Sequence, residues 1–313
     1  MIDVRRVRVL VEVASQGSMA GAADALHYTP SAVSQQIATL EREVGVALVE
    51  RGPRSITLTD AGRTLVAHAE IVLSRLELAE TEIKEIAGLH GGRLRLATFR
   101  SAGETILAEA ITTFHERHPQ VELTLVEAEP EEYLAEIKAG RIDLGLNFRY
   151  EGVKYLDVDS TEDFLLMEDP IGVALPLSHR LAGAAEVDLT ELVEDPWVSS
   201  PPRSSVHEFT ANVCRAAGFE PRINFETNDY HVAQALVASG VGVAFLPALA
   251  TAVAHPGLVV LPIASRPLLR QIIAVCRAGG LRSPTTAQML ALLQEIGERA
   301  GAEQRLPVLP DGH

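Results

Sequence analysis

The chain has 313 residues, of which 47% are hydrophobic, and this length and composition suit two or three folded modules with sizeable cores. Its formal net charge of −15 excludes a protein that is basic throughout, and residues 1–90 alone carry 9 Lys and Arg against 12 Asp and Glu. Any affinity for nucleic acid would therefore have to rest on individually placed arginines. The candidates are Arg5, Arg6, Arg8, Arg51 and Arg54.

Cysteine content and hydropathy indicate which cellular compartment suits the protein. Cys214 and Cys276 are far apart, which fits a reducing compartment and argues against a disulfide framework or a metal-binding spacing. The N-terminus is charged and no run of about 18 apolar residues follows, so we expect neither a signal peptide nor a membrane span. The sequence predicts a soluble, cytoplasmic protein.

Three short helices are predicted near the N-terminus. Residues 4–14 place apolar side chains on one stripe, and residues 19–44 predict two further helices joined by a tight turn at His27-Tyr28. Ser18 is the expected N-cap of the first helix of this pair. Thr29 is the expected N-cap of the second. Pro30 then stands in the first helical position, where proline is tolerated because a backbone N–H would have no hydrogen-bond partner within the helix.

The second helix of this pair has two different faces. Its apolar stripe consists of Val33, Ile37 and Leu40, at the spacing i, i+4, i+7. The opposite face carries uncharged side chains rich in donors and acceptors, namely Ser31, Ser34, Gln35 and Thr39. Such a face suits the reading of base edges in a major groove, and an αα-hairpin without a role in DNA binding is the alternative.

This stretch closely resembles the helix-turn-helix of LysR-type transcriptional regulators. The match consists of Gly17-Ser18, Ala22-Ala23, Leu26, Ser31-Ala32-Val33-Ser34, Gln36-Ile37, Leu40-Glu41, Gly45, Leu58-Thr59 and Ala61-Gly62. Most members have Gln where this chain has Pro30, so base reading is expected to shift to the neighbouring positions. The residues expected to contact DNA are Ser18, Thr29, Pro30, Ser31, Ser34, Gln35, Arg51 and Arg54.

Residues 46–58 predict a short hairpin around Gly52-Pro53, with Ile56 and Leu58 alternating after the turn. We interpret it as a wing whose tip brings Arg51 and Arg54 to the phosphates that flank the groove. An ordinary solvated turn is the alternative.

Residues 59–89 predict a long helix with an unbroken heptad seam. The seam consists of Leu65, Ala69, Val72, Leu76, Ala79, Ile83 and Ile86. A lone helix of this length is marginally stable, so the seam needs a partner. The stretch resembles the linker helix through which the family dimerises, which implies a homodimer or homotetramer, and packing against the chain's own domain is the alternative.

From Arg93 onward, strands and helices alternate, a pattern typical of a parallel sheet, and the first helix of this part is expected to start at Glu104. A second set of elements follows from Ile171, with strands expected over residues 171–175 and 272–275 and a helix from Asp229 after the capping pair Thr227-Asn228. A terminal helix over residues 284–299 is expected to return to the first set. Family markers continue here: Phe114, His118-Pro119, Val121 and Leu123, the run from Gly140 to Gly145, the run from Leu177 to Leu181 and the run from Ala238 to Pro247. They imply an α/β, two-lobed effector domain of the periplasmic-binding-protein type (type 2).

These observations predict four parts. Residues 1–58 form a winged helix-turn-helix, residues 59–89 the linker helix, residues 90–305 the effector domain and residues 306–313 a disordered tail. Within the effector domain, lobe I covers about 91–165 and 268–303, and lobe II covers about 166–267.

Ligands of open α/β sheets bind beyond the C-terminal ends of strands, close to helix N-termini. Four such ends are expected to meet between the lobes, and the family resemblance favours Ser101 as an effector contact. The expected effector-binding residues are Thr98, Arg100, Ser101, Glu129, Ser199, Ser200 and Asn228. Hydroxyl and helix-terminal N–H groups favour a small anion or polar molecule, whereas the acidic Glu127 and Glu129 weaken an assignment to anions. Arg100 and Arg203 either add positive charge or are solvated surface.

Nothing in the sequence supports catalysis, a metal or another cofactor. His115 and His118 have no third ligand near them in sequence, and no nucleophile elbow, phosphate loop or dinucleotide fingerprint is found. Peroxide-sensing relatives use two cysteines in lobe II. Here Ser205 stands where the reactive thiol is expected, nine residues before Cys214, so we expect Cys214 to pack in the core.

The sequence therefore predicts a non-enzymatic transcriptional regulator that binds double-stranded operator DNA and responds to a small-molecule effector. Its expected partners are a second copy of the chain, operator DNA, the effector and RNA polymerase, with no membrane, and it would lie on the nucleoid when bound. A two-lobed carrier or enzyme, and a regulator that needs no effector, are the alternatives.

Overall fold

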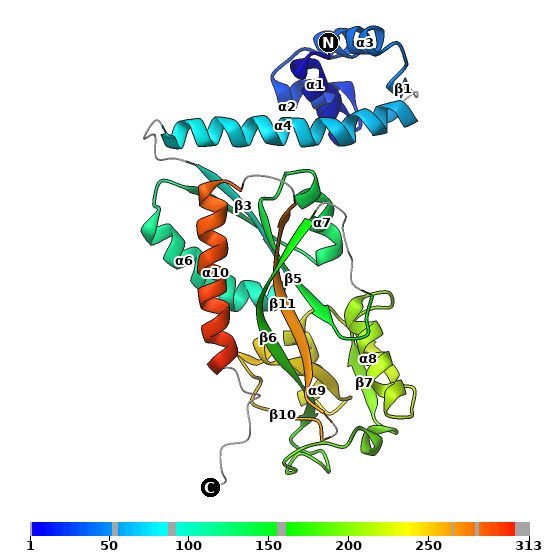
Figure 1. The fold of residues 1–313 in the computed structure, drawn as a ribbon. Coiled ribbons are helices and arrows are strands. Elements are labelled where there is room, and N and C mark those ends of the chain that lie inside the picture. Colours follow the sequence, from blue (N-terminus) through cyan, green and yellow to red (C-terminus); the bar gives the residue numbers. More distant parts are fainter. Residues whose placement is uncertain are drawn as a thin grey trace. The chain divides into compact units, whose positions relative to one another are not determined.

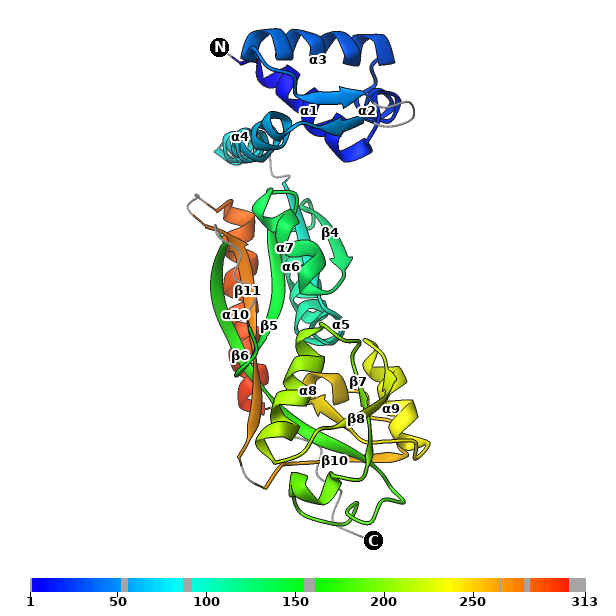
Figure 2. The ribbon, with the colours of Figure 1, turned by 90° about the vertical axis from the view of Figure 1, so that its right-hand side faces the viewer.

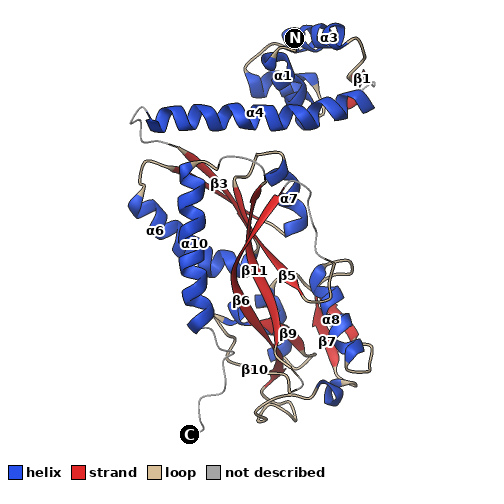
Figure 3. Cartoon of the chain, in the orientation of Figure 1, coloured by secondary structure: helices blue, strands red, loops and turns tan. Residues whose placement is uncertain are grey.

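A computed structural model of the protein describes residues 2–51, 56–86, 92–154, 161–264, 266–278 and 282–303. The chain forms two compact units, one built on residues 1–90 and the other on residues 91–313, except that Lys138–Arg141 group with the first. Each unit has its own hydrophobic core. The first is mainly helical, whereas the second combines helices with long strands (Figures 1 and 3).

The N-terminal unit begins with the three predicted helices, α1 (Val4–Gln16), α2 (Met19–Leu26) and α3 (Pro30–Val44). Both predicted N-caps are confirmed: Ser18 Oγ accepts a hydrogen bond from the Gly21 N–H at 3.0 Å, and Thr29 Oγ1 accepts one from the Ala32 N–H at 3.2 Å. The stripe of Val33, Ile37 and Leu40 is fully buried in the core that the three helices share. The helix-turn-helix predicted from the sequence is therefore present.

The predicted hairpin is also confirmed. Strands β1 (Val49–Arg51) and β2 (Ile56–Leu58) pair antiparallel, with Val49 opposite Leu58. A Glu41 carboxylate oxygen accepts from the backbone N–H of Leu48 at 2.8 Å, which ties the hairpin to α3. Arg54, at the expected tip, lies outside the described residues, as does the side chain of Arg51.

Helix α4 (Asp60–Ile86) starts directly beside this hairpin. Glycine disfavours a helix interior, yet Gly62 stands in the first turn of α4. The structure gives the reason, because a Cβ atom at Gly62 would lie 2.0 Å from the Leu48 carbonyl oxygen. The close approach of helix and hairpin therefore requires glycine here.

The predicted heptad seam of α4 divides into two parts. Leu65 and Ala69 pack against the core of the N-terminal unit. Farther along, Val72, Leu76 and Ile83 are 49%, 45% and 65% exposed, and Ala79 is exposed as well, whereas the side chain of Ile86 lies outside the described residues. The beginning of the seam therefore belongs to its own domain, and the dimer contact of the remainder stays a prediction.

The C-terminal unit is organised on one seven-stranded mixed sheet with the order β10-β6-β11-β5-β3-β4, to which β9 is added beside β6. Strands β3 (Arg93–Thr98), β4 (Glu122–Glu127) and β5 (Leu144–Tyr150) are parallel, with β3 between the other two. This confirms the parallel arrangement predicted for the first lobe.

Two long antiparallel strands, β6 (Thr161–Pro176) and β11 (Leu268–Arg277), belong to both lobes and lie side by side (Figure 1). The sequence predicted only residues 171–175 and 272–275, so both predicted strands were too short. Residues 161–170 carry four acidic residues and Pro170, a composition typical of loops. Pairing with β11 on one side overrides that local preference.

Lobe II contains the parallel pair β7 (Pro196–Ser199) and β8 (Arg222–Glu226), and β9 (Ala244–Pro247) and β10 (Leu258–Leu261) pair with β6. Helices α8 (Ser205–Ala216) and α9 (Tyr230–Ala238) pack in this lobe (Figure 2), as do the short 3-10 turns η2 (Leu189–Leu192) and η3 (Ala248–Thr251). The predicted cap of α9 at Thr227-Asn228 is wrong, because the side chain of Asp229 accepts from the backbone of His231 and Val232.

Lobe I carries one composite helix after β3. It consists of α5 (Arg100–Ala102), a π-helical turn, η1 (Gly103–Leu107), and α6 (Ala108–Arg117), so it begins four residues before the predicted start at Glu104. Helix α7 (Pro130–Lys138) follows β4, and α10 (Pro284–Glu303) packs on α6 and β6, which confirms the predicted return of the terminal helix (Figure 1).

Replacing Gly62 with Ala tests the close approach of α4 and the hairpin. Because the neighbouring atom is a backbone oxygen that cannot move aside, Gly62→Ala should lower the free energy of unfolding by about 1–3 kcal/mol in spite of the better helix propensity of Ala. The midpoint of thermal unfolding measures this. Gly183→Ala is the control, since its added Cβ meets open space, and an equal effect of both changes would contradict the packing argument.

Candidate functional site

The polar face of α3 is largely exposed. Pro30, Ser31 and Gln35 are exposed, and Ser34 is half-buried. Thr29 and Ser18 are occupied as helix caps, and Thr29 Oγ1 also lies 3.0 Å from Ser31 Oγ. The structure therefore brings the predicted DNA-contacting residues of α3 together on one side of the helix.

Arg6, one of the arginines considered for phosphate contacts, is used inside the domain. Its Nε donates to the Gln36 side chain at 3.3 Å, and its guanidinium pairs with Glu43, so it joins α1 to α3. Arg5 and Arg8 are exposed on α1. Part of the positive charge of this domain is therefore paired with an acidic side chain inside the domain.

A narrow cavity of about 40 Å³ lies between the two lobes of the C-terminal unit. It is lined by five of the predicted effector-binding residues, Arg100, Ser101, Glu129, Ser200 and Asn228. The N-terminal ends of α5, α7, α8 and α9 all reach it, because each of these helices follows the C-terminal end of a strand or the loop after it. Helix N-termini carry partial positive charge and unpaired N–H groups, so the cavity suits polar or anionic ligands.

The other two predicted residues lie outside this lining. Thr98 is buried, and its hydroxyl donates to the Phe99 carbonyl at 3.1 Å. Ser199 is also buried and donates to Thr210 Oγ1 at 3.1 Å. Both hydroxyls are engaged with groups of their own lobe, and a direct contact with an effector stays a prediction for each residue.

The floor of the cavity is a charged residue that the sequence analysis did not select. Arg270 on β11 is fully buried, and its Nε donates to Asp169 Oδ2 on β6 at 2.7 Å. Its Nη2 donates to Ser101 Oγ at 2.8 Å, and its guanidinium lies 5.3 Å from the centre of the Phe99 ring. Arg270 stands in the strongly apolar strand β11, and this interruption is a signal that could have revealed it, whereas Asp169 is one of several acidic residues in β6 and carries no such signal.

Arg270 is part of a larger buried network. Tyr150 is hydrogen-bonded to Arg270 and to Tyr230, and burial raises the pKa of both tyrosines. Burial also raises the pKa of Asp169, although Arg270 and the Leu249 N–H oppose this effect by stabilising the carboxylate. The network joins lobe I, through Ser101, to lobe II, through Tyr230 and Leu249.

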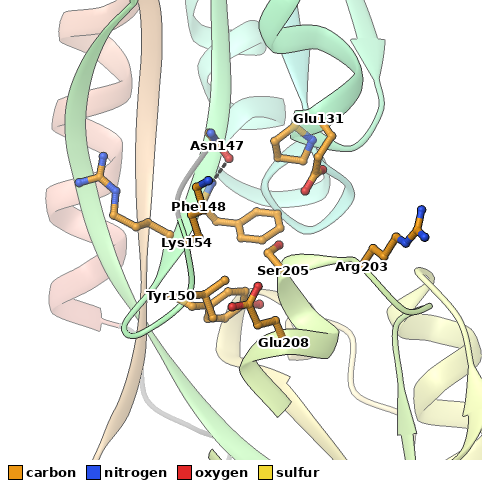
Figure 4. A pocket seen from close by; sticks show the side chains of 11 residues that line it. Glu131, Asn147, Phe148, Tyr150, Lys154, Arg203, Ser205 and Glu208 are labelled. Carbon is orange, nitrogen blue, oxygen red and sulfur yellow. Dashed lines mark hydrogen bonds between the residues drawn. The ribbon is translucent and has the colours of Figure 1, made fainter. Parts of the chain in front are cut away.

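A second cavity of about 220 Å³ adjoins the first (Figure 4). Both share Glu131, Phe148 and Ser205 in their linings, so the narrow cavity opens toward a wider one. Lys154, Arg203 and Glu208 add charge around the wider cavity. Arg203 has a left-handed backbone with φ of 74°, a conformation that is strained for a residue with a Cβ atom.

Ion pairs join the lobes at the cavity. Arg100 at the start of α5 lies 3.0 Å from Asp229, which caps α9, and 3.3 Å from Glu127 at the end of β4. Glu104 lies 3.3 Å from His231 on α9. The positive charge of Arg100 is thus compensated by acidic groups, and the residue closes one side of the cavity.

Glu129 is a titratable group in the lining of the narrow cavity whose pKa is clearly shifted. Burial raises its pKa to about 7, with additional repulsion from Glu131, Glu132 and Glu127 and an opposing attraction from Arg270. At neutral pH this carboxyl group therefore exists in both forms, and its neutral form donates a hydrogen bond that a carboxylate does not. The predicted obstacle to an anionic ligand is correspondingly smaller.

Both halves of the chain match known protein families. Residues 4–63 match the family described as "Bacterial regulatory helix-turn-helix protein, lysR family", and residues 87–297 match the family described as "LysR substrate binding domain". The chain belongs to the LysR family. This LysR-family protein is accordingly a transcriptional regulator that joins a helix-turn-helix domain to an effector-binding domain.

Curated relatives are similar over most of their length. ShiR, an HTH-type transcriptional regulator of Corynebacterium glutamicum (strain R), is 32% identical over 283 residues, which cover 89% of this chain and 94% of the relative. GltC, a transcriptional dual regulator of Bacillus subtilis (strain 168), is 29% identical over 246 residues, covering 79% of this chain and 81% of GltC.

Solved structures show the same fold. A variant of full-length OxyR from Pseudomonas aeruginosa aligns with a TM-score of 0.71 at 21% identity, covering 95% of this chain and 97% of OxyR. CbnR, described as a LysR family transcriptional regulator, aligns with a TM-score of 0.64 at 22% identity and covers 94% of this chain and 99% of CbnR.

Among the described residues, no helix has the length and hydrophobicity needed to cross a bilayer.

The two cysteines are placed as the sequence analysis expected for Cys214. Cys214 and Cys276 are buried, and burial raises the pKa of each thiol to about 12. Ser205, at the position of the missing reactive thiol, is the first residue of α8 and lines both cavities. Thiols with such high pKa values hold almost no thiolate at neutral pH and are poor nucleophiles.

The raised pKa of Glu129 predicts a pH-dependent stability difference. The folded pKa is about 7, and an unfolded Glu titrates near pH 4.3, so between these values the folded protein holds a proton that the unfolded chain has lost. The Glu129 contribution to stability therefore falls as the pH rises through this window. Glu129→Gln should stabilise the domain by on the order of 2 kcal/mol at about pH 8 and by little at about pH 4.5.

Urea unfolding of the wild type and the Glu129→Gln variant at both pH values measures this difference. An equal difference at the two pH values would show that the carboxyl group is not buried against the acidic residues around it.

Proposed function

We propose that this LysR-family regulator reads operator DNA with α3 and its wing, as a homodimer held by α4, and that its effector binds in the narrow cavity between the lobes. One observation carries the effector site: residues predicted at four separate chain segments, Arg100 and Ser101, Glu129, Ser200, and Asn228, line one cavity. Strand ends and helix N-termini meet there, as ligand sites of this fold class do.

DNA reading rests on the exposed face of α3. Gln35 offers an amide that pairs with adenine N6 and N7, and Ser31 and Ser34 hydrogen-bond to any base edge within reach. Pro30 presents only an apolar ring, which is suited to a thymine methyl group. A dimer places two recognition helices in successive major grooves, so the half-sites should lie about 10 bp apart. Two dimers on neighbouring sites would form the tetramer, and RNA polymerase is the further partner.

The exposed part of the α4 seam supports the dimer. Val72, Leu76, Ala79 and Ile83 leave three large apolar side chains in solvent along one stripe of a 27-residue helix. Knobs-into-holes packing against a second α4 would bury this stripe at the heptad spacing that the sequence already has. The surface fits a second copy of the same helix.

The cavity supports binding rather than catalysis. Arg100 pairs with both Asp229 and Glu127, and the hydroxyls of Thr98 and Ser199 are engaged with their own lobe. Ser101, Ser200 and Asn228 present polar groups around a small volume, which holds a ligand by hydrogen bonds without a nucleophile and base in contact. We therefore infer that the protein acts by binding alone.

Two substitutions distinguish contacts with base edges from contacts with the DNA backbone. Gln35→Ala should relax the preference at one base pair in each half-site, at a cost of about 1–3 kcal/mol for the preferred site only. Arg51→Ala should weaken binding to all sequences alike and make the salt dependence shallower by about one unit. Competition binding on randomised operators at several salt concentrations measures both effects. Gln35→Ala acting only on the salt slope would remove α3 from base reading.

The dimer surface is tested by placing charges in the exposed seam. Leu76→Glu with Ile83→Glu would bury two unpaired carboxylates at the proposed contact and should convert dimers to monomers. The matched control is Ile71→Glu, because Ile71 is 41% exposed on the same helix but lies off the seam. Light scattering gives the mass of each variant, and a double variant with the mass of the wild type would place the dimer contact elsewhere.

A further inference from the structure

The last turn of α3 contains three consecutive charged residues, Glu41, Arg42 and Glu43, which have different surroundings. A Glu41 carboxylate oxygen accepts from the backbone N–H of Leu48 at 2.8 Å, and Glu43 pairs with Arg6 of α1. Arg42 is exposed, and no carboxylate pairs with it in the part of the chain that the structure describes. The two acidic side chains are therefore engaged with their own domain, whereas the positive charge between them faces solvent.

The Arg42 side chain is held along the surface of α3. Its Nε donates to the Ala38 carbonyl oxygen at 3.3 Å, and its Nη2 donates to Thr39 Oγ1 at 2.8 Å. A helical side chain leans toward the preceding turn, which brings the guanidinium beside these two residues. Two of the five N–H donors of a guanidinium are used in this way, so three remain for a ligand.

Arg42 lies on the same face of α3 as the residues proposed to read bases, but at a distance from them. Ser31, Gln35 and Arg42 are spaced i, i+4 and i+11, which places them on one face. At about 1.5 Å per residue, Arg42 is roughly 16 Å along the axis from Ser31, whereas the major groove of B-DNA is about 12 Å wide. A helix whose first turns contact base edges therefore reaches the phosphates at the border of the groove with its last turn.

The end of α3 needs a positive charge if it approaches phosphates. The C-terminal end of a helix carries a partial negative charge, which repels anions. Arg42 is the basic residue in the last turn of α3, directly before the end of the helix at Val44. Its planar guanidinium suits two parallel hydrogen bonds to phosphate oxygens. In the N-terminal unit, α3 lies on the side opposite α4, so α4 does not cover this face (Figures 1 and 2).

Resting on the proposed reading of DNA by α3, we propose that Arg42 binds a DNA phosphate at the border of the major groove, and that Thr39 is a positioning residue that holds the Arg42 guanidinium. The contact fixes the register of α3 on the duplex and carries no base preference of its own. It places positive charge on the binding face of a domain in which residues 1–90 carry 9 basic against 12 acidic side chains. The two flanking glutamates conceal this role in the sequence.

The salt dependence of DNA binding by the full-length protein tests the phosphate contact. The probe is a duplex isolated from a random pool by the wild-type protein. Arg42→Gln should make the plot of log affinity against log salt shallower by about 0.9 for each half-site. The affinity deficit of the variant should then shrink by about 3.5-fold per half-site from about 50 mM to about 200 mM salt. A salt slope equal to that of the wild type overturns the proposal.

Substitutions of Thr39 test its positioning role. Thr39→Val is nearly isosteric and removes the acceptor of the Arg42 Nη2 hydrogen bond, so it should weaken binding to all sequences. Thr39→Ser keeps a hydroxyl and should restore the wild-type affinity. Binding by Thr39→Val that equals the wild type at every salt concentration would remove Thr39 from the proposal.

Neutral methylphosphonates, placed one at a time along both strands of the duplex, locate the contact. At one position in each half-site, the losses from the methylphosphonate and from Arg42→Gln should not add, because each change removes the same interaction. Arg5→Gln is the control, since it removes an equal charge from an exposed arginine on α1, and its effect should add to that of this methylphosphonate. Additive losses with Arg42→Gln at every position contradict a phosphate contact.

Selection of duplexes by each variant separates this proposal from the reading of DNA by α3. Arg42→Gln should select the same base sequence as the wild type, and an altered preference at one base pair would mean that Arg42 reads a base instead of a phosphate. Gln35→Ala tests α3 itself. Unchanged base preference in Gln35→Ala would remove α3 as the reading helix. A relaxed preference in Gln35→Ala, together with no phosphate coupled to Arg42, would remove only the role of Arg42.

Discussion

The effector-binding domain depends on the buried ion pair of Asp169 and Arg270. Both side chains are fully buried, and each removes a full charge from water, which costs several kcal/mol per ion before their attraction returns part of it. A well-packed apolar pair would serve stability equally well. The pair therefore points to a requirement other than stability, namely a fixed donor beneath the cavity between the lobes.

The position of this pair in the sheet gives it influence over both lobes. Asp169 and Arg270 are directly opposite in the β6–β11 register, in the two strands that the lobes share, and Arg270 is also opposite Tyr150 on β5. Ser101 from lobe I and the Leu249 N–H from lobe II bond to the same pair. A group that competes for Arg270 in the cavity therefore acts on contacts of both lobes at once.

Most of the fold follows from periodicity, because its elements bury regular stripes. The i, i+4, i+7 spacing of Val33, Ile37 and Leu40, with the caps at Ser18 and Thr29, predicted the helix-turn-helix, and alternation predicted the parallel strands of lobe I. The first half of β6 could not be found in this way, since its acidic residues and Pro170 are tolerated only through pairing with β11. The local composition of a segment does not predict its secondary structure where pairing with a distant strand determines that structure.

The candidate site was predictable to the extent that it lies at strand ends. Arg100, Ser101, Glu129, Ser200 and Asn228 come from such ends and meet at the cavity, whereas Thr98 and Ser199 turn toward their own lobe. Arg270 and Asp169 lie in strand interiors, and the rule that ligands bind beyond the C-terminal ends of strands does not select such positions. Their partnership joins residues 101 positions apart, and a single sequence does not show which strands become neighbours.

The N-terminal domain shows how a regulator with an acidic chain can bind DNA. Arg6 is consumed by Gln36 and Glu43, and residues 1–90 carry more acidic than basic side chains, so the domain lacks a general attraction to phosphates. Non-specific binding rests on that attraction and should be weak. In the proposed dimer, discrimination would then come from the neutral donors and acceptors of α3 in both copies of the domain, since each added base contact counts in every half-site. The acidic balance thus gives a physical reason for the proposed dimer.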